Sequence, residues 1–354
     1  GEDWDGDGTP EPPITCVFAA GNDGPDPTVS LDGPGIAKNV IQVGATTNPP
    51  FFAPGSIADF SSRGPTTDGR IKPDVVAPGY YVVGPFTGMY MYGWLTPDPV
   101  QALHVWAAGT SMATPQVAGA AALWHEIFGG IGLTPSPSAT KALIVNFADW
   151  MGLDPTVDND GNGNPDLYDM GFGQLDFYNW ITYPGTLVIC DECINVAGGW
   201  SVTVYFDVED PSVPLRVTLA WNDPPQWTPG VPALINDIDL EVIAPDGTTY
   251  YGNDLTPPYD DQRDSVNNVE RVIIDTPTTG RYAIRIRARS TPLSDPPVSL
   301  VIFGAGLPKF PGPFGPGVGG TYAPSVLPIA VAVATASIAG AAVVLAYRRR
   351  KKRD

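Results

Sequence analysis

The sequence predicts an α/β part, then an antiparallel β-sandwich of the jelly-roll type, and finally one C-terminal transmembrane helix. Three observations support this order. A run of small residues after Gly109 is typical of a tightly packed helix. Apolar and polar residues alternate strand by strand between residues 185 and 306. Residues 325–347 form an uncharged, mostly apolar stretch of the length that a bilayer requires.

The composition limits the classes of protein that fit. The chain has 354 residues, enough for two domains, and its 40 glycines and 40 prolines favour loops and short strands over long helices. The formal net charge is −19, which argues against nucleic-acid binding because the phosphates would be repelled.

The most informative motif is Gly-Thr-Ser-Met-Ala-Thr-Pro at residues 109–115. Pro115 falls in the first turn of the expected helix, where its missing N–H has no intrahelical partner to lose. Ser111 is thereby placed at a helix N-terminus. Backbone N–H groups converge there and the helix dipole is positive, so a developing oxyanion is stabilised.

A second motif, residues 16–24, reads as a buried strand that runs into a Gly-Asn turn. Together the two motifs resemble those of the subtilisin-like serine proteases. The resemblance implies an α/β core with a parallel sheet and with Ser111 as the nucleophile on a central helix. It also implies that the Asn22 carboxamide donates to the oxyanion, which it can do without carrying charge. The substrate-binding positions that it implies are Ala19, Ala20, Gly21, Gly109 and Thr110.

The resemblance extends over about residues 14–305. Segments 59–65 and 71–79 lie between the two motifs and are similar to the family. Segments beyond residue 214 are similar to the C-terminal β-domain of one alkaline subgroup. In related proteases such a domain is thought to stabilise the catalytic core, and binding of a substrate or a surface is the alternative.

The catalytic histidine and aspartate that the family requires have no counterpart in this sequence. His104 and His125 are the two histidines present, and neither precedes Asn22, as the family order requires. We expect both to be structural. The sequence therefore reads as the C-terminal part of a longer enzyme, with very little activity by itself.

The anchor prediction rests on residues 325–347 and on the six basic residues in the tail 348–354. Basic residues stay on the cytoplasmic side, so the prediction is a single-pass cell-membrane protein with its protease part outside and its C-terminus inside. The predicted boundaries are 1–184 for the peptidase part, 185–306 for the β-sandwich, 307–324 for a Pro/Gly-rich linker, 325–347 for the helix and 348–354 for the tail.

An acidic loop at residues 158–169 has the spacing of a calcium-binding loop, with glycine at its sixth position. The candidate ligands of a structural calcium ion are Asp158, Asp160, Asn162, Asn164, Asp166 and Asp169. Aspartate stands at the twelfth position, where such loops usually carry a bidentate glutamate. A polar surface loop is the alternative interpretation.

Cys190 and Cys193 form one Cys-x-x-Cys pair without the further ligands that zinc requires. A small local disulfide and two free thiols both fit. The functional prediction is a membrane-anchored serine endopeptidase that acts on extracellular peptides and proteins, with no organic cofactor. The alternative is a non-catalytic cell-surface binding protein that retains a protease scaffold.

Overall fold

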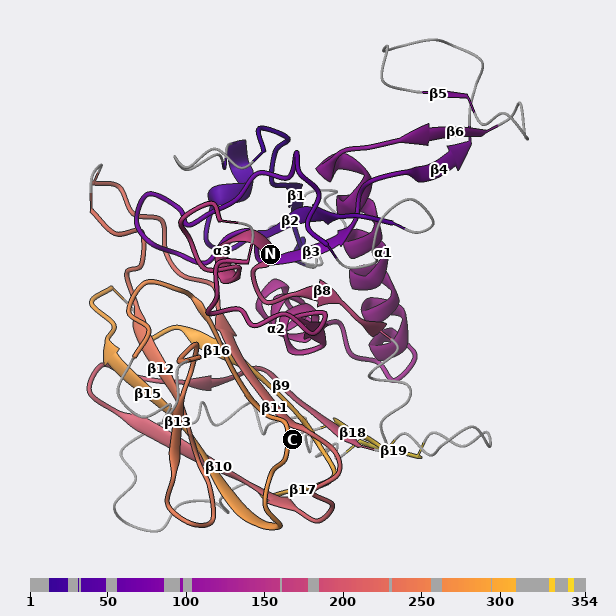
Figure 1. Ribbon diagram of the computed structural model, residues 1–354. Helices are drawn as coiled ribbons and strands as arrows, with labels where there is room; N and C mark the ends of the chain where they lie inside the picture. The colour runs from indigo at the N-terminus through magenta and orange to yellow at the C-terminus, as the bar shows by residue number, and fades with distance from the viewer. Residues whose placement is uncertain are drawn as a thin grey trace, which may run out of the picture. The chain divides into compact units, whose positions relative to one another are not determined.

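The computed structural model describes residues 13–24, 31, 33–48, 56–85, 96–97, 104–159, 161–177, 185–228, 231–255, 263–293, 295–309, 331–334 and 343–346 (Figure 1). The chain divides into two compact units. The serine unit comprises residues 15–123 and 148–176, and the sandwich unit comprises residues 1–14, 124–147 and 177–354.

A five-stranded sheet forms the centre of the serine unit, in the order β1-β2-β3-β8-β7. Its first four strands run parallel, and β7 pairs antiparallel with β8. All six residues of β2 are buried, which is typical of a parallel sheet covered on both faces. The strands are β1 (Val17–Ala19), β2 (Ile41–Thr46), β3 (Val75–Pro78), β7 (Ala148–Asp149) and β8 (Gln174–Leu175).

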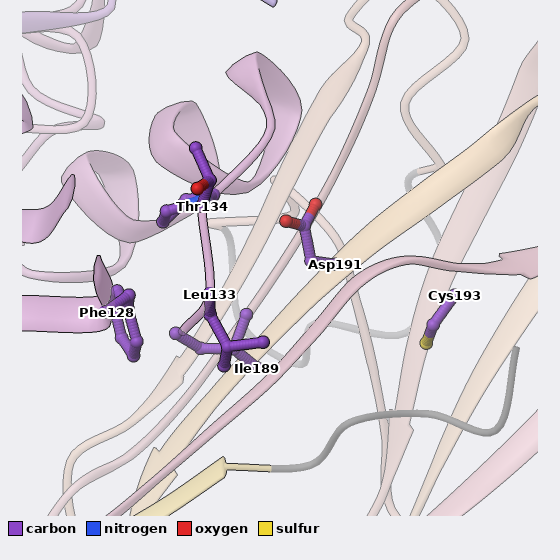
Figure 2. Close-up of a pocket in the computed structure, with 7 residues that line it drawn as sticks. Phe128, Leu133, Thr134, Ile189, Asp191 and Cys193 are labelled. Atoms are coloured by element: carbon purple, nitrogen blue, oxygen red, sulfur yellow. The ribbon is translucent and has the colours of Figure 1, made fainter. Parts of the chain in front are cut away.

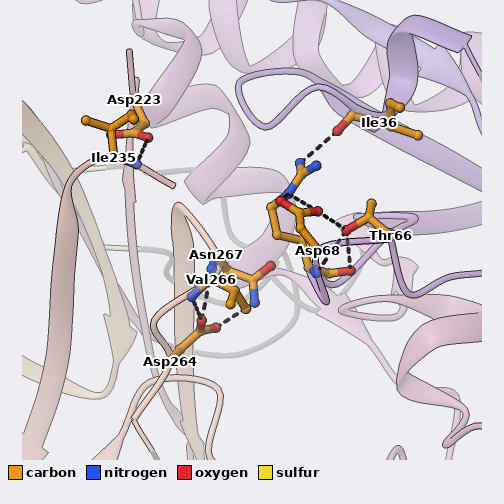
Figure 3. A network of polar contacts seen from close by, with 9 residues as sticks. Ile36, Thr66, Asp68, Asp223, Ile235, Asp264, Val266 and Asn267 are labelled. Carbon is orange, nitrogen blue, oxygen red and sulfur yellow. Dashed lines mark hydrogen bonds and ion pairs between the residues drawn. The ribbon is translucent and has the colours of Figure 1, made fainter. Parts of the chain in front are cut away.

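Helix α1 (Thr110–Gly129) starts in the serine unit, and its residues from 124 onward belong to the sandwich unit. A separate antiparallel sheet leads into it, with β6 (His104–Ala107) between β4 (Val82–Pro85) and β5 (Thr96–Pro97). The short elements η1 (Gly33–Ile36) and α3 (Leu167–Met170) complete the unit. In the loop 66–70, the Asp68 carboxylate accepts from Thr66 and Arg70, which holds the turn together (Figure 3).

Two antiparallel sheets make up most of the sandwich unit, in the orders β13-β12-β15-β10-β17 and β14-β11-β16-β9-β18-β19. Alternate residues of β10 are buried, as the alternation in the sequence requires. The strands are β9 (Thr186–Asn195), β10 (Ser201–Val208), β11 (Leu215–Trp221), β12 (Asp237–Ile243), β13 (Thr249–Tyr251), β14 (Val269–Ile274), β15 (Gly280–Ser290), β16 (Pro297–Gly304) and β17 (Gly306–Lys309).

Carboxylates organise the loops of the sandwich unit. Asp264 accepts hydrogen bonds from the backbone N–H groups of Val266 and Asn267, both at 2.9 Å (Figure 3). Asp223 accepts in the same way from Ile235 at 2.8 Å and from Asn236 at 2.9 Å. These contacts satisfy backbone donors in loops that lack a strand partner.

Helix α2 (Pro137–Asn146) belongs to the sandwich unit and is buried along its length. Ser136 caps its N-terminus by accepting from the Ala139 N–H. The Asp191 carboxylate of β9 in turn accepts from the Ser136 N–H at 2.9 Å. At the other end, Arg216 and Arg271 donate to the last carbonyl groups of the helix, those of Asn146 and Val145. Anions at the N-terminus and cations at the C-terminus both complement the helix dipole.

Cys190 and Cys193 are joined by a disulfide, so the structure has the small local disulfide and not two free thiols. The register of β9 against β16 shifts at this point, and Glu192 adopts a φ of +46°. The bridged segment borders a cavity of about 140 Å³ whose walls are mostly apolar (Figure 2). The lining residues are Phe128, Leu133, Thr134, Pro135, Ile189, Asp191 and Cys193.

The predicted transmembrane helix is wrong. Two parts of residues 325–347 are strands, β18 (Val331–Ala334) and β19 (Val343–Ala346), which pair antiparallel. Among the described residues no helix has the length and apolar character needed to cross a bilayer. An apolar stretch satisfies its backbone polar groups either as a helix or in a ladder, and valine favours the ladder. The predictions of a single-pass membrane location and of membrane contact depended on this helix and are withdrawn with it. The predicted tail, residues 348–354, lies outside the described residues.

The first residue of β12 gives the sandwich unit a pH-dependent contribution to stability. Burial, with the nearby carboxylates of Asp239 and Asp264, raises the pKa of Asp237 to about 6. An acid whose pKa rises on folding binds its proton more tightly in the folded state. Its stabilising contribution is complete below the unfolded pKa and is lost as the pH rises through about 6.

We therefore expect Asp237→Asn to stabilise the protein at pH 8 by roughly 1–3 kcal/mol and to change little near pH 3.5. Urea unfolding at both pH values measures the difference. Asp275→Asn is the matched control, because Asp275 is an exposed aspartate of the same unit. An equal effect of Asp237→Asn at both pH values would contradict the assignment.

Candidate active site

The turn before α1 depends on two glycines. Gly109 has a φ of +151°, a region that favours glycine, and its N–H donates to the Gly79 carbonyl at 2.8 Å. A Cβ on Gly79 would lie 2.6 Å from the Ala45 Cβ and 2.8 Å from the Gly109 oxygen. The close approach of these backbones fixes where the helix begins relative to the sheet.

Ser111 is the second residue of α1, and its side chain is exposed. The first N–H groups of a helix have no intrahelical acceptor, so they are available to an external anion. The structure thus has Ser111 at a helix N-terminus, where its hydroxyl is open to solvent.

Asn22 lies directly beside this turn. Its Oδ1 accepts from the Thr110 N–H at 2.9 Å and from the Thr110 hydroxyl at 3.0 Å. These two bonds fix the carboxamide so that Oδ1 faces Thr110. A Cβ on Gly109 would lie 3.6 Å from Asn22 Nδ2 and 3.7 Å from Ser111 N, so the two nitrogens border one space.

The residues expected to form a substrate wall adjoin the same turn. Gly21 has a φ of +110°, and its N–H donates to the Thr110 hydroxyl at 3.3 Å. The Gly21 carbonyl accepts from the Ser62 N–H at 3.0 Å, and a Cβ on Gly21 would lie 2.7 Å from Ser62 Oγ. Ala20 is fully buried and donates to the Val43 carbonyl, while Ala19 is half-buried at the end of β1.

The role of the Thr110 hydroxyl is not apparent from the sequence. This group links the Gly21 backbone to the Asn22 side chain, so it joins the two motifs across 88 residues of sequence. Ser62 makes a second link, because its Oγ accepts from the Asp23 N–H at 3.2 Å. A hydroxyl at either position is compatible with many structures, and nothing in the sequence singles out these partners.

Neither histidine is hydrogen-bonded to Ser111 within the described residues. His104 is half-buried on β6. His125 Nε2 lies 3.2 Å from the Thr140 hydroxyl, and at about 1.5 Å per residue it stands roughly 21 Å along α1 from Ser111.

The acidic loop is held together by its own side chains. The Asp158 carboxylate accepts from three backbone N–H groups, those of Gly161, Asn162 and Gly163, at 2.7–3.1 Å. The Asp166 carboxylate accepts from the backbone and the side chain of Asn159. The carboxylates of Asp158 and Asp166, at the first and ninth positions, therefore accept hydrogen bonds from N–H groups of the loop itself.

The remaining candidate ligands have partners as well. Asp169 is buried, accepts from Asn162 Nδ2 and pairs with Arg63 at 3.3 Å. Asn162 Oδ1 accepts from the Asn164 N–H, and Asp160 lies outside the described residues. No group of three acidic, histidine or cysteine side chains in the described part of the chain is arranged to hold a metal ion. The calcium site stays a prediction from the sequence.

The calcium prediction is tested by thermal unfolding. If the loop binds calcium, a chelator is expected to lower the unfolding midpoint by several degrees and added calcium to restore it. Asp158→Asn removes the effect, whereas Asp154→Asn, outside the loop, leaves it in place. A midpoint that is the same with chelator and with calcium would refute the site.

The parallel sheet, the serine at a helix N-terminus and the two nitrogens beside it make this part of the structure an α/β fold with a candidate serine nucleophile. A model of the subtilase family, peptidase S8, matches residues 3–173. This part of the chain belongs to the subtilases, a family of serine proteases.

Several known proteases are similar to parts of this chain. The chain is 27% identical over 332 residues to a Dictyostelium discoideum serine protease/ABC transporter B family protein, over 82% of this chain and 18% of the relative. It is 36% identical over 148 residues to the serine protease AprX of Bacillus subtilis, over 41% and 32%. Among solved structures, the patellamide maturation protease PatA is 27% identical over 45% of this chain and 46% of that chain, with a TM-score of 0.31. The chain thus spans a third or less of these two relatives.

Proposed function

We propose that this chain carries the nucleophile and the oxyanion site of a serine endopeptidase. The observation that carries the proposal is that Asn22 Nδ2 and Ser111 N border one space in front of Gly109. Two N–H donors that border one space suit the negative oxygen of a tetrahedral intermediate. We further propose that the histidine base and its aspartate come from residues outside this sequence, because neither histidine here is bonded to Ser111.

The mechanism follows from these positions. Ser111 Oγ attacks the peptide carbonyl carbon as its proton passes to the imidazole, and the carbonyl oxygen becomes an oxyanion. Asn22 Nδ2 and the Ser111 N–H donate to that oxygen. Collapse of the intermediate breaks the C–N bond, and the imidazolium protonates the leaving amine. Water then hydrolyses the acyl-enzyme by the same steps.

Peptides and proteins are the proposed substrates. Ala19 and Gly21 are half-buried and carry a small side chain or none, so the wall that they form leaves room for an apolar residue before the scissile bond. Ala20 is fully buried and is not part of that surface. No organic cofactor takes part in this chemistry.

The sandwich unit is proposed to support the peptidase fold. The family match includes α2, which nevertheless packs within the sandwich unit. Asp191 stands at its N-terminus, and the buried Arg216 and Arg271 stand at its C-terminus. Phe147 ends the helix and stacks on Trp124, with ring centroids 5.6 Å apart. A helix of the peptidase sequence thus depends on partners beyond the family match.

A fluorophosphonate probe tests the function. We expect the probe to label the full-length protein at Ser111, because only an activated serine is phosphonylated at a useful rate. Mass spectrometry of the labelled peptide identifies the residue, and Ser212→Ala, an exposed serine in the sandwich unit, is the matched control. Absence of labelling in the folded full-length protein would favour the alternative, a non-catalytic binding protein.

A further inference from the structure

Two neighbouring serines, Ser61 and Ser62, are fully buried in the serine unit and bond to two different backbone segments. The Ser61 Oγ accepts from the Ala45 N–H on β2 at 3.0 Å. The Ser62 Oγ accepts instead from the Asp23 N–H at 3.2 Å. Loss of a buried acceptor leaves its donor unsatisfied, which is costly, so each serine holds the segment that carries its partner.

Ser62 bonds to the backbone on both sides of Asn22. The Ser62 N–H donates to the Gly21 carbonyl at 3.0 Å, and the Ser62 Oγ accepts from the Asp23 N–H. One residue is thus bonded to the neighbour before Asn22 and to the neighbour after it. The backbone of Asn22 is thereby fixed from both directions.

The close approach of Ser62 to this turn depends on a glycine. Gly21 has a φ of +110°, and a Cβ on it would lie 2.7 Å from Ser62 Oγ, closer than non-bonded atoms come. The Gly24 N–H donates to the Phe60 carbonyl at 2.9 Å and adds a second link between the same two segments. Segment 60–62 therefore packs directly against the turn at residues 21–24.

The side chain of Asn22 is held by a different residue. Asn22 Oδ1 accepts from the Thr110 N–H at 2.9 Å and from the Thr110 hydroxyl at 3.0 Å. These bonds set the rotation of the carboxamide, whereas the bonds of Ser62 set the place of the Cα from which it extends. The position of Nδ2 beside Ser111 N depends on both.

We propose that Ser62 is a positioning residue of the oxyanion site, which acts on the reaction through Asn22. This inference rests on the proposed endopeptidase function. Ser62 is fully buried, so its hydroxyl is not open to a substrate. An oxyanion donor acts in the transition state only when it is already in place, and a displacement of about 1 Å costs up to about 10²-fold in rate.

The first experiment compares two serine variants of the full-length protein. Ser62→Ala is expected to lower kcat for a peptide amide substrate by about 5- to 50-fold, with KM within about twofold of the wild-type value. Ser61→Ala is the matched control, because it also removes a fully buried acceptor of a backbone N–H, but not beside residue 22. We expect both variants to lower the unfolding midpoint by a similar few degrees and only Ser62→Ala to lower kcat.

A double-mutant cycle separates positioning from general damage. Asn22→Leu lacks Nδ2, so in that background Ser62→Ala is expected to change kcat by less than about twofold. The rate at which a fluorophosphonate labels Ser111 is the second measurement, because the phosphonyl oxygen takes the place of the carbonyl oxygen. It is expected to fall with kcat in Ser62→Ala. Ser62→Cys keeps the shape and weakens only the acceptor, so its kcat lies between the other two, and the same cycle applies to it.

Three results overturn the proposal. The first is an unchanged kcat in Ser62→Ala, and the second is an equal loss of kcat in Ser61→Ala. The third is a loss in Ser62→Ala that persists in full in the Asn22→Leu background. In each case the wild-type protein still cleaves peptides and the probe still labels Ser111, so the proposed function stands. A wild-type protein that neither cleaves peptides nor reacts with the probe refutes the function, and the positioning role is refuted with it.

Discussion

Ser111→Ala is expected to lower kcat of the full-length protein for peptide hydrolysis by about a million-fold, which is the loss found for the equivalent change in subtilisin. The change removes only the hydroxyl group, whose oxygen forms the acyl bond in the proposed mechanism. Water held near the oxyanion donors accounts for the small activity that remains. The release of product from a peptide amide substrate measures the effect.

The fold is expected to survive this substitution. Ser111 is exposed in the first turn of α1, where alanine is tolerated, so the unfolding midpoint changes by no more than a few degrees. Ser212→Ala, exposed in the sandwich unit, serves as the control with full activity. Should Ser111→Ala keep more than about a hundredth of the wild-type kcat, another residue would be the nucleophile.

The local motifs predicted the position of Ser111 well because their signals are steric. Gly109 and Gly21 adopt positive φ, and Gly79 lies where a Cβ would collide with Ala45. At such positions any other residue would be strained or would clash, so the glycines in the sequence indicate the backbone conformation. The approach of Asn22 to Thr110, by contrast, is a contact between distant segments that spacing alone does not determine. The resemblance implied only that Asn22 and the Ser111 N–H donate to the same oxyanion.

Two features could not be predicted from the sequence for identifiable reasons. The length and the absence of charge of the stretch 325–347 predict a helix, but these two properties do not distinguish a helix from paired strands such as β18 and β19. The ring contacts of Phe60 with Tyr80 and of Tyr81 with Trp106 are not predictable, because these residues lie in three separate segments with no shared period. Only the fold brings these segments together.

Asn22→Asp is the most informative single change at the oxyanion site. Aspartate keeps an oxygen at the position of Oδ1, so the hydrogen bonds from the Thr110 N–H and hydroxyl are retained. It replaces the donor Nδ2 with a negatively charged oxygen. We expect kcat to fall by at least about 10²–10³-fold with KM little changed, because the lost donor acts mainly in the transition state.

Asn22→Leu removes the donor without adding a charge, and it also leaves the Thr110 donors without their acceptor. It is therefore expected to lose about 10²–10³-fold in kcat and, unlike Asn22→Asp, some stability as well. The Thr110→Ser variant, which keeps the hydroxyl, controls for disturbance of the turn. If both Asn22 variants retained kcat and raised KM instead, Asn22 would bind the ground state, and the space beside Gly109 would not be an oxyanion site.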